Sequence, residues 1–502
     1  MKTYLFRIIF SLNIFVGLTE LQMIAGDIIY PWRAAKAIVQ VEGNLKILYD
    51  NINSSLIDSV ILEGPYNRII LQIDSVINDR FIFDSFTLAS VNNQIFVTIP
   101  KGTPEELYNL IVKCGGETHL SPRSVQVIRE FKKKHSFIHI TDLHISRQWV
   151  GTSVDGYAKE LELFDNFIKV ANIISPDFII VTGDLIHDYT RINADSTGWG
   201  GTTLTSAYEN PLVEEKWKNC YEGSSGFSGL NKLNSPVFTM PGNHDFYGLN
   251  IEDYKSKSLQ WNKYCGLRAY GFSYGDTRLI AADDFLGDPI SDIPSSSPMS
   301  GLQGEVFNSF FKQNGSGLIR IMAQHRHDRV DTAFINERRI NILLQGHSHT
   351  PYEKKIGITP TLSIRPGVVC RSGVREIDDE LGLFRIFTIE DNKFTYTPPI
   401  RFCKDPRKPY SELELNLTLE FKNPNTGAFS NNEAIILNSF PVDLSNCKIR
   451  FVMKKGEYYV SSGTINQIIQ TDNLSVIDVF TDVKSGEQKS IKIFKTKNSK
   501  KS

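Results

Sequence analysis

The chain has 502 residues, enough for more than one domain with a buried core. Hydrophobic residues make up 41% of the sequence and charged residues 22%, as in ordinary globular proteins, which argues against a fibrous or largely disordered chain. The formal net charge is −1, so no overall field selects nucleic acid or an acidic membrane as a partner, although local patches are not excluded. We therefore expect no nucleic acid as a structural partner, and the oligomeric state stays open.

The N-terminus carries the pattern of a secretory signal. Lys2 and Arg7 precede an apolar stretch at residues 8–18. That stretch is shorter than the roughly 20 residues needed to span a bilayer, and no later segment is long and apolar enough. The pattern predicts a signal peptide at residues 1–25 and a secreted or lumenal protein without a transmembrane anchor, the alternative being a buried first strand or helix.

An oxidising compartment would have two consequences. The six cysteines could form disulfides, for which the sequence allows 15 full pairings; they are Cys114, Cys220, Cys265, Cys370, Cys403 and Cys447. Four asparagines begin N-x-S/T triplets and would be glycosylated if exposed, namely Asn53, Asn314, Asn416 and Asn473.

Residues 26–134 are expected to form a β-sandwich domain. Short β-branched or aromatic runs, separated by Asn, Asp and Gly, predict strands at residues 37–41, 68–73, 81–83 and 94–99. The basic run at residues 131–134 is interpreted as a solvated boundary, with a basic binding patch as the alternative.

Residues 135–395 alternate between strands and helices and are expected to form an α/β domain. Helical spacing of apolar residues predicts a helix over residues 157–174. Strands are predicted at residues 137–141, 178–182, 237–240, 279–282, 318–323 and 340–344. Residues 193–231 are rich in Gly, Ser and Thr, and we interpret them as a long irregular excursion over the active-site face.

Residues 396–502 return to a pure β pattern and are expected to form a C-terminal β domain. Leucine and phenylalanine alternate with polar residues over residues 413–421, which predicts a half-buried strand. Lys455–Gly456 and Ser485–Gly486 are predicted hairpin turns.

Five short motifs carry the chemistry, and most follow a predicted strand. Two residues that are i and i+2 in an extended chain point the same way, so Asp142 and His144 could face one ion together. The α/β sheets of proteins place their ligand sites at the C-terminal ends of parallel strands, so we expect the motifs to meet there. The motifs are Asp142-Leu143-His144, Gly183-Asp184, Gly242-Asn243-His244-Asp245, His325 and Gly346-His347-Ser348-His349.

Imidazole and carboxylate ligands without cysteine suit Zn²⁺, Mn²⁺ or Fe, and they argue against a closed structural zinc site. Two divalent ions that share a bridging carboxylate would lie roughly 3.5–4 Å apart and would clamp a phosphoryl group. Only Asp142 and Asp184 would oppose the charge of the two ions, so the site should attract an anion. Each motif alone is explained by a turn or a strand end, and only the whole set indicates a metal site.

The ordered set resembles the calcineurin-like metallophosphoesterase superfamily over about residues 137–391. The resemblance implies a four-layer αββα sandwich, here flanked by N- and C-terminal all-β, Ig-like domains. It implies that one metal is held by Asp142, His144 and His349, that the other is held by Asn243, His325 and His347, and that Asp184 bridges them. It further implies that His244 is the general acid or a transition-state stabiliser, with Asp245 orienting it.

The chain departs from one branch of this family. Purple acid phosphatases carry a tyrosine three residues after the bridging aspartate, where this chain has His187, which argues against a purple Fe(III) centre. Four further residues are weaker candidates: Arg147 for the phosphate, His327 for the site, and Tyr247 and Trp149 for the substrate mouth, each with a surface or packing role as the alternative. His119, His135 and His139 are assigned to structure.

These observations predict a secreted enzyme with two divalent metal ions that hydrolyses a phosphomonoester or phosphodiester by direct attack of metal-bound hydroxide. One alternative is a nucleotide or cyclic-nucleotide phosphodiesterase. Another is a non-catalytic adhesion or scaffold protein that retains the metals for stability, against which the complete ligand set and His244 argue.

Overall fold

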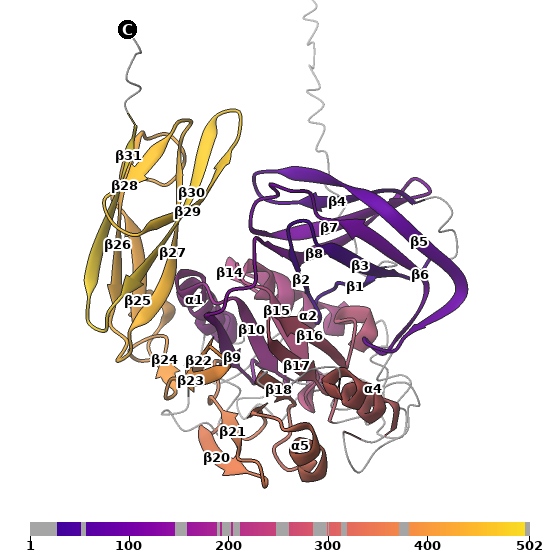
Figure 1. Ribbon diagram of the computed structural model, residues 1–502. Helices are drawn as coiled ribbons and strands as arrows, with labels where there is room; N and C mark the ends of the chain where they lie inside the picture. Colours follow the sequence, from indigo (N-terminus) through magenta and orange to yellow (C-terminus); the bar gives the residue numbers. More distant parts are fainter. Residues whose placement is uncertain are drawn as a thin grey trace, which may run out of the picture.

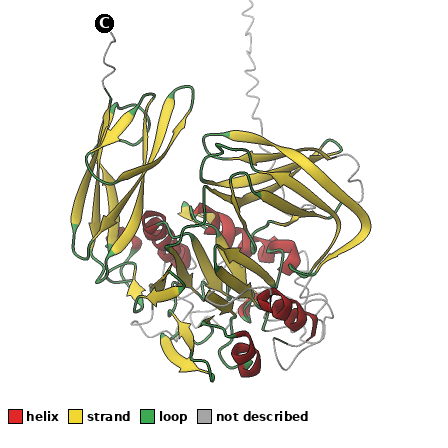
Figure 2. Cartoon of the chain, viewed as in Figure 1, coloured by secondary structure: helices red, strands yellow, loops and turns green. Residues whose placement is uncertain are grey.

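The computed structural model describes residues 28–51, 57–145, 158–187, 191–192, 202–203, 211–246, 261–284, 299, 301–312, 319–370 and 381–496. The predicted signal peptide, the acceptors Asn53 and Asn314, and the candidates Arg147, Trp149 and Tyr247 lie outside these residues. Strands form most of the structure, and the few helices gather around one region (Figure 2).

The N-terminal region is one eight-stranded sheet that folds around a core of its own. The predicted strands at residues 68–73 and 81–83 are parts of a single strand of 17 residues, which pairs with one neighbour at its start and with another over the rest of its length. In order across the sheet the strands are β1 (Ile28–Tyr30), β3 (Asn44–Tyr49), β6 (Ala89–Thr98), β5 (Arg68–Asp84), β4 (Ile57–Glu63), β7 (Glu106–Cys114), β8 (Glu117–Ile128) and β2 (Ala37–Gln40).

Two mixed six-stranded sheets form the central region. The first contains, in order, β15 (Val237–Met240), β10 (Phe178–Thr182), β9 (His135–Ile140), β22 (Leu383–Glu390) and β23 (Lys393–Tyr396), with β24 (Ile400–Arg401) beside β22. The second contains β16 (Tyr270–Tyr274), β17 (Thr277–Ala281), β18 (Ile319–Ala323), β19 (Ile342–Leu344), β21 (Thr361–Arg365) and β20 (Tyr352–Ile356). Phe178 and Phe238 of the first sheet pack against Phe272 of the second, with ring centroids 5.4 and 3.7 Å apart, so the sheets share a core.

Helices cover the outer faces of these sheets. α1 (Ala158–Ile174) begins within one residue of its prediction, and its predicted apolar face is buried: Leu161, Phe164, Ile168 and Ala171. It packs on the first sheet, where Phe167 contacts Phe384 and Phe402. α4 (Gly301–Lys312) and α5 (Thr332–Arg338) share a second core with residues of β17, β18 and β19.

The C-terminal region consists of two antiparallel sheets. One contains β25 (Leu417–Phe421), β26 (Asn431–Asn438), β31 (Gln488–Lys495) and β28 (Tyr458–Val460), and the other contains β27 (Leu444–Lys454), β30 (Leu474–Val483) and β29 (Thr464–Gln470). Buried and exposed residues alternate along β26 and β27, as expected of strands with one face on a core.

Three expectations about elements are wrong in detail. Lys455–Gly456 and Ser485–Gly486 do not close hairpins, because the strands on either side of each turn belong to different sheets. The strand predicted at residues 413–421 begins only at Leu417, after a 3-10 turn at Tyr410–Glu412. Residues 211–231 are not irregular, since α2 (Pro211–Glu222) lies there and buries Trp217 and Tyr221. All six cysteines are buried and none forms a disulfide.

The two β regions stand side by side above the central region (Figure 1). They contact each other through Arg450 of β27, whose guanidinium lies 2.6 Å from Glu106 of β7. The N-terminal region also reaches into the central region, because the Ala34 carbonyl accepts hydrogen bonds from Thr239 and from the hydroxyl of Tyr270. Within the described residues, no helix has the length and apolarity needed to cross a bilayer.

Candidate metal centre

The predicted site residues follow five strands that end at the same edge. β9, β10 and β15 run parallel in the first sheet, and β18 and β19 run parallel in the second. Their C-terminal ends therefore face one place, and the loops after them carry the motifs. The structure brings together all nine residues of the predicted site: Asp142, His144, Asp184, Asn243, His244, Asp245, His325, His347 and His349.

The backbone at this edge is not extended, although we expected Asp142 and His144 to point the same way because the strand before them would continue. Five of the predicted ligands have left-handed backbones, with φ of 53° at Asp142, 50° at His144, 53° at Asp184, 75° at His347 and 59° at His349. This conformation is uncommon for residues other than glycine and costs on the order of 1–3 kcal/mol each. The side chains converge because the chain turns sharply at each ligand.

A first group of donors consists of Asp142, His144 and His349, whose ligand atoms lie within 4.8 Å of one another. The Nε2 atoms of the two histidines are 3.1 Å apart. Oδ1 of Asp142 lies 3.6 Å from His144 Nε2 and 3.4 Å from His349 Nε2. His144 and Asp142 are fully buried, while His349 is partly exposed.

A second group consists of Asp184, His325 and His347, again with ligand atoms within 4.8 Å. Asn243 belongs beside it, because its Oδ1 lies 3.0 Å from His325 Nε2. Oδ2 of Asp184 is 3.1 Å from His325 Nε2 and 3.8 Å from His144 Nε2 of the first group. The Asp184 carboxylate thus stands between the two groups.

Backbone groups hold these side chains from behind. The ring of His325 donates from Nδ1 to the carbonyl of Thr182 at 2.7 Å, which directs Nε2 into the site. Oδ2 of Asp142 accepts the backbone N–H of His347, and Oδ1 of Asp184 accepts that of His244. Each carboxylate therefore has one oxygen fixed by the protein and one directed at imidazoles.

The glycines of the motifs are required by close packing. A Cβ at Gly183 would lie 2.5 Å from His325 Nδ1, and one at Gly242 would lie 2.2 Å from Asp184 Oδ1. A Cβ at Gly346 would lie 2.0 Å from Thr141 Oγ1 and 2.9 Å from Asp142 Oδ2. Since these distances are far below van der Waals contact, no other residue fits without moving a ligand or its support.

The donors fit a cation. Oδ1 of Asp142 and Oδ2 of Asp184 are buried and have no hydrogen bond, an arrangement that is costly unless a positive charge compensates it. Burial would raise the pKa of Asp184, but the charge of His325 outweighs it and holds that pKa below its ordinary value. Burial and His325 lower the pKa of His347 to about 4, so its ring is neutral at pH 7 and can donate a lone pair.

His325 is in the opposite state. Burial would lower the pKa of its ring, but the carboxylate of Asp184 raises it to about 10. A metal ion that binds Nε2 of His325 must therefore displace a proton.

His244 lies beside the first group, with its ring edge-on to that of His144 at 4.6 Å between centroids. Its Nδ1 contacts the backbone carbonyl of His187, and the two rings stack at 5.3 Å. His187, the residue in place of the tyrosine of purple acid phosphatases, is thus buried against the site.

The contacts of Asp245 differ from those expected of a residue that orients His244. Its Oδ1 accepts the backbone N–H groups of Leu185 and Ile186, and its Oδ2 accepts that of Gly242. It therefore ties the loop after β10 to the loop after β15. Burial and the nearby Asp184 raise its pKa to about 7.

Arg365 at the end of β21 was not anticipated. Its guanidinium lies 4.4 Å from the Tyr352 ring, and Nε and one terminal nitrogen are buried without a hydrogen bond. Burial lowers its pKa, while the charges of Tyr352 and Asp142 oppose that effect. In the sequence, the only indication of its role was its position at the end of an apolar strand, which pairs with β19 in the structure.

His327 is exposed, with its ring 5.6 Å from that of His347.

The structural roles of two other histidines are also visible. His135 contacts the hydroxyl of Thr277 at 3.0 Å, and His139 contacts that of Thr182 at 2.9 Å.

Comparisons with known proteins address the same region. The sequence profile of the calcineurin-like phosphoesterase family matches residues 135–351. No curated protein matches the chain. Among solved structures, PhoD is similar with a TM-score of 0.45 at 9% identity, over 82% of this chain and 91% of PhoD. The sulfate thiohydrolase SoxB of Termus thermophilus gives a TM-score of 0.31 at 9% identity, over 53% of this chain and 56% of SoxB. A Vps29 mutant of Entamoeba histolytica gives 0.22 at 10% identity, over 61% of this chain and 92% of Vps29. The chain therefore contains a domain at residues 135–351 that matches the calcineurin-like phosphoesterase family.

Proposed function

We propose that the protein is a secreted phosphoesterase that uses two divalent metal ions, Zn, Mn or Fe, to hydrolyse phosphomonoesters or phosphodiesters. The observation that carries the proposal is the position of Asp184, whose buried Oδ2 lies between His144 of one donor group and His325 of the other. A carboxylate in this position is suited to bridge two ions.

The proposed ligands of one ion are Asp142, His144 and His349, and those of the other are Asn243, His325 and His347, with Asp184 shared. When bound, the ions supply Lewis acidity and a nucleophilic water. The two ions would bring four positive charges against two carboxylates, so the site favours an anionic ester. Arg365 adds a positive charge that acts on Asp142 of the site and so favours an anionic ester further.

His244 is the proposed general acid for the leaving oxygen. The His187 carbonyl accepts a hydrogen bond from Nδ1, which fixes the orientation of the ring beside the first donor group. Asp245 is a positioning residue, since it holds the loop that carries His244 rather than the ring itself.

Activity and metal content together test the proposal. Purified protein loaded with Mn²⁺ or Zn²⁺ is expected to hydrolyse p-nitrophenyl phosphate or bis-p-nitrophenyl phosphate. His244→Ala should lower kcat by roughly 10²–10⁴-fold and keep the metal, measured by elemental analysis. His119→Ala, in the N-terminal sheet, is the control and should leave kcat unchanged.

Two alternatives make different predictions. A nucleotide or cyclic-nucleotide phosphodiesterase would prefer those diesters over the aryl esters by kcat/KM. A scaffold protein that keeps the metals for stability would bind both ions and turn over nothing in a broad panel of phosphate esters, and that result would overturn the proposal.

We also propose the finer architecture. The two central sheets with α1 on one outer face and α4 and α5 on the other support a four-layer αββα sandwich. The proposed domains are a signal peptide at 1–25, β domains of the Ig-like kind at 26–134 and 396–502, and the catalytic domain at 135–395.

Asn473 is exposed and is the best placed glycosylation acceptor, whereas Asn416 is half-buried and donates to the Arg401 carbonyl. Secretion from a eukaryotic host, followed by N-terminal sequencing, tests the cleavage; a mature chain that retains residues 1–25 would refute it.

A further inference from the structure

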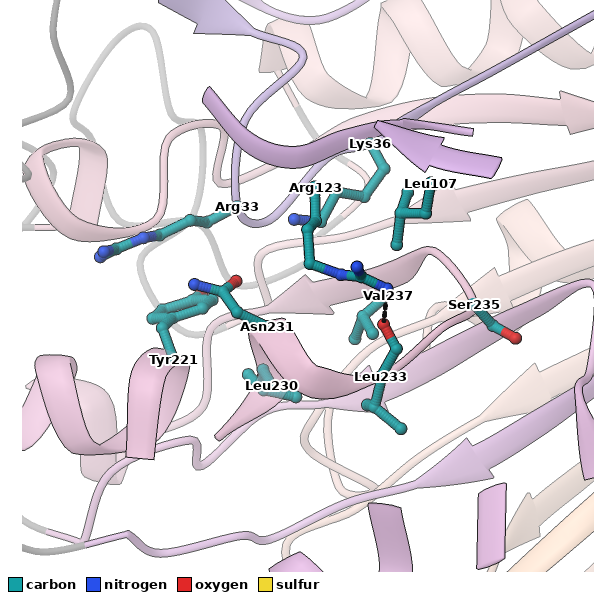
Figure 3. Close-up of a pocket in the computed structure, with 10 residues that line it drawn as sticks. All are labelled: Arg33, Lys36, Leu107, Arg123, Tyr221, Leu230, Asn231, Leu233, Ser235 and Val237. Carbon is teal, nitrogen blue, oxygen red and sulfur yellow. Dashed lines mark hydrogen bonds between the residues drawn. The ribbon is translucent and has the colours of Figure 1, made fainter. Parts of the chain in front are cut away.

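Three cationic side chains gather around a cavity between the N-terminal and central regions (Figure 3). Arg33, Lys36 and Arg123 come from the N-terminal region, and Tyr221 and Asn231 of the central region lie across the cavity from them. Arg33 and Lys36 are buried, with 3% and 5% of their surface exposed.

Little negative charge compensates these cations. Arg33 lies 3.5 Å from Glu222, whose side chain is one-third exposed. Arg123 donates to the carbonyl of Leu233 and to the side chain of Asn234, both uncharged, and its Nε is buried without a hydrogen bond. Two carboxylates therefore act on the three cations, Glu222 beside Arg33 and the more distant Glu106 on Arg123.

Lys36 has the fewest hydrogen-bonding partners of the three cations. Within the part of the chain that the structure describes, its Nζ makes no hydrogen bond and no ion pair. Burial, together with the charges of Arg33 and Arg123, lowers its pKa to about 7. A buried ammonium with two arginines beside it is costly unless an anion joins it or the lysine loses its proton.

We propose that this cavity binds a single inorganic anion of halide size, with chloride as the physiological ligand. The size follows from the space between the lining atoms, which fits a group about as large as one water molecule. The anion would accept from Lys36 Nζ and would be attracted by the charge of the Arg123 guanidinium. Asn231 offers an uncharged donor on the opposite wall.

The site is distinct from the metal centre. Ser235 and Val237 line the cavity at the start of β15, whereas Asn243 and His244 follow the other end of that strand. A strand of four residues spans roughly 13 Å, so the two sites lie at opposite ends of the sheet. The anion would hold the N-terminal region on the central region, because the lining residues come from both.

Thermal unfolding in chloride and in gluconate at equal ionic strength tests the proposal. The wild-type midpoint is expected to be about 1–3 °C higher in 150 mM chloride, because a ligand that binds only the folded state stabilises it. Lys36→Met, which keeps the length of the side chain but removes the charge, should abolish the difference. Lys101→Met removes an exposed charge from the same region and should retain it.

A second measurement keeps the proposal testable if the shift is small. Crystals grown in bromide should show an anomalous peak in the cavity beside Lys36 Nζ, and the peak should be absent from Lys36→Met. The proposal is overturned if Lys36→Met responds to chloride as the wild type does, if sulfate or phosphate stabilises as strongly as chloride, or if bromide leaves the cavity with water alone.

Discussion

Each of the three motif glycines leaves no room for a methyl group beside a ligand or its support. Gly242 shows this best, because its φ is not positive and the restriction comes from the Asp184 carboxylate, which would lie 2.2 Å from a Cβ atom at that position. The proposed bridging carboxylate thus depends on a residue that makes no bond to a metal.

Gly242→Ala is expected to displace Asp184, to lower metal affinity by roughly 10–100-fold and to destabilise the protein by about 1–3 kcal/mol. Calorimetric titration with Mn²⁺ or Zn²⁺ and urea unfolding in EDTA measure the two effects. Gly271→Ala in β16 is the matched control, because its Cβ would lie 3.5 Å from the nearest atoms, an ordinary contact. Wild-type metal affinity in Gly242→Ala would contradict the packing argument.

Some residues of the candidate metal centre could be predicted from their residue type and from the strand that precedes them. His144, His325 and His349 are examples, because a histidine after an apolar run has few roles. The partner of Asp245 could not be predicted, since its carboxylate bonds to backbone N–H groups that any sequence would offer. Arg365 could not be assigned either, because an arginine at a strand end is common and only the three-dimensional structure places it near Asp142.

At the scale of elements, strand existence was predictable and strand partnership was not. β10 and β15 begin and end as predicted because buried parallel strands are continuous apolar runs. The turn at Ser485–Gly486 has the composition of a hairpin, yet β30 and β31 pair with different neighbours. The local sequence indicates that the chain turns, but it does not indicate whether the next strand joins the same sheet.

The contact between β7 and β27 is an ion network that joins the two β regions. Arg450 of β27 makes two hydrogen bonds to Asp478 at 2.7 and 2.8 Å and one to Glu106 at 2.6 Å. Both carboxylates are buried, and the neighbouring charges lower the pKa of Asp478 to about 2 despite burial. Gln467 adds hydrogen bonds to Glu105 and Asp478.

Arg450→Met is expected to destabilise the protein by about 2–4 kcal/mol, because it leaves buried carboxylates without their main partner. Urea unfolding of wild type and variant measures the loss, and in a double-mutant cycle with Glu106→Gln the two losses should not add. Arg407→Met is the control: Arg407 pairs with Asp405 on the surface, where solvent screens the pair and its loss should change stability little. An additive cycle would show that the β regions are not coupled through this network.

At the scale of the whole molecule, the central region depends on its neighbours. Trp32 and Ala34 of the N-terminal region are buried in it, and Gly266 lies against the Trp32 ring. Phe440, between β26 and β27 of the C-terminal region, belongs to the same apolar core as Phe384 of β22. The composition change near residue 134 predicted a boundary but not this shared core, because burial between regions depends on contacts far apart in sequence.

We expect the buried histidines of the core to lower the free energy of unfolding of the whole protein at acid pH. Burial lowers the pKa of His139 to about 3, with Arg385 adding to the effect, and burial also lowers the pKa of His135. In the unfolded chain these rings titrate near 6.5, so below that pH the unfolded state binds more protons than the folded state. The stabilisation is fully present above about pH 6.5 and is lost as the pH falls toward 3.

His139→Gln removes one of these titrating rings and keeps a donor for the Thr182 hydroxyl. Between pH 7 and pH 5 the wild type should lose about 1–2 kcal/mol more free energy of unfolding than the variant, since one proton bound only by the unfolded state changes stability by about 1.4 kcal/mol per pH unit. Urea unfolding of EDTA-treated protein at both pH values measures the difference without metal binding. Equal losses in wild type and variant would show that His139 is protonated in the folded core and that the apolar packing around it does not exclude the charge.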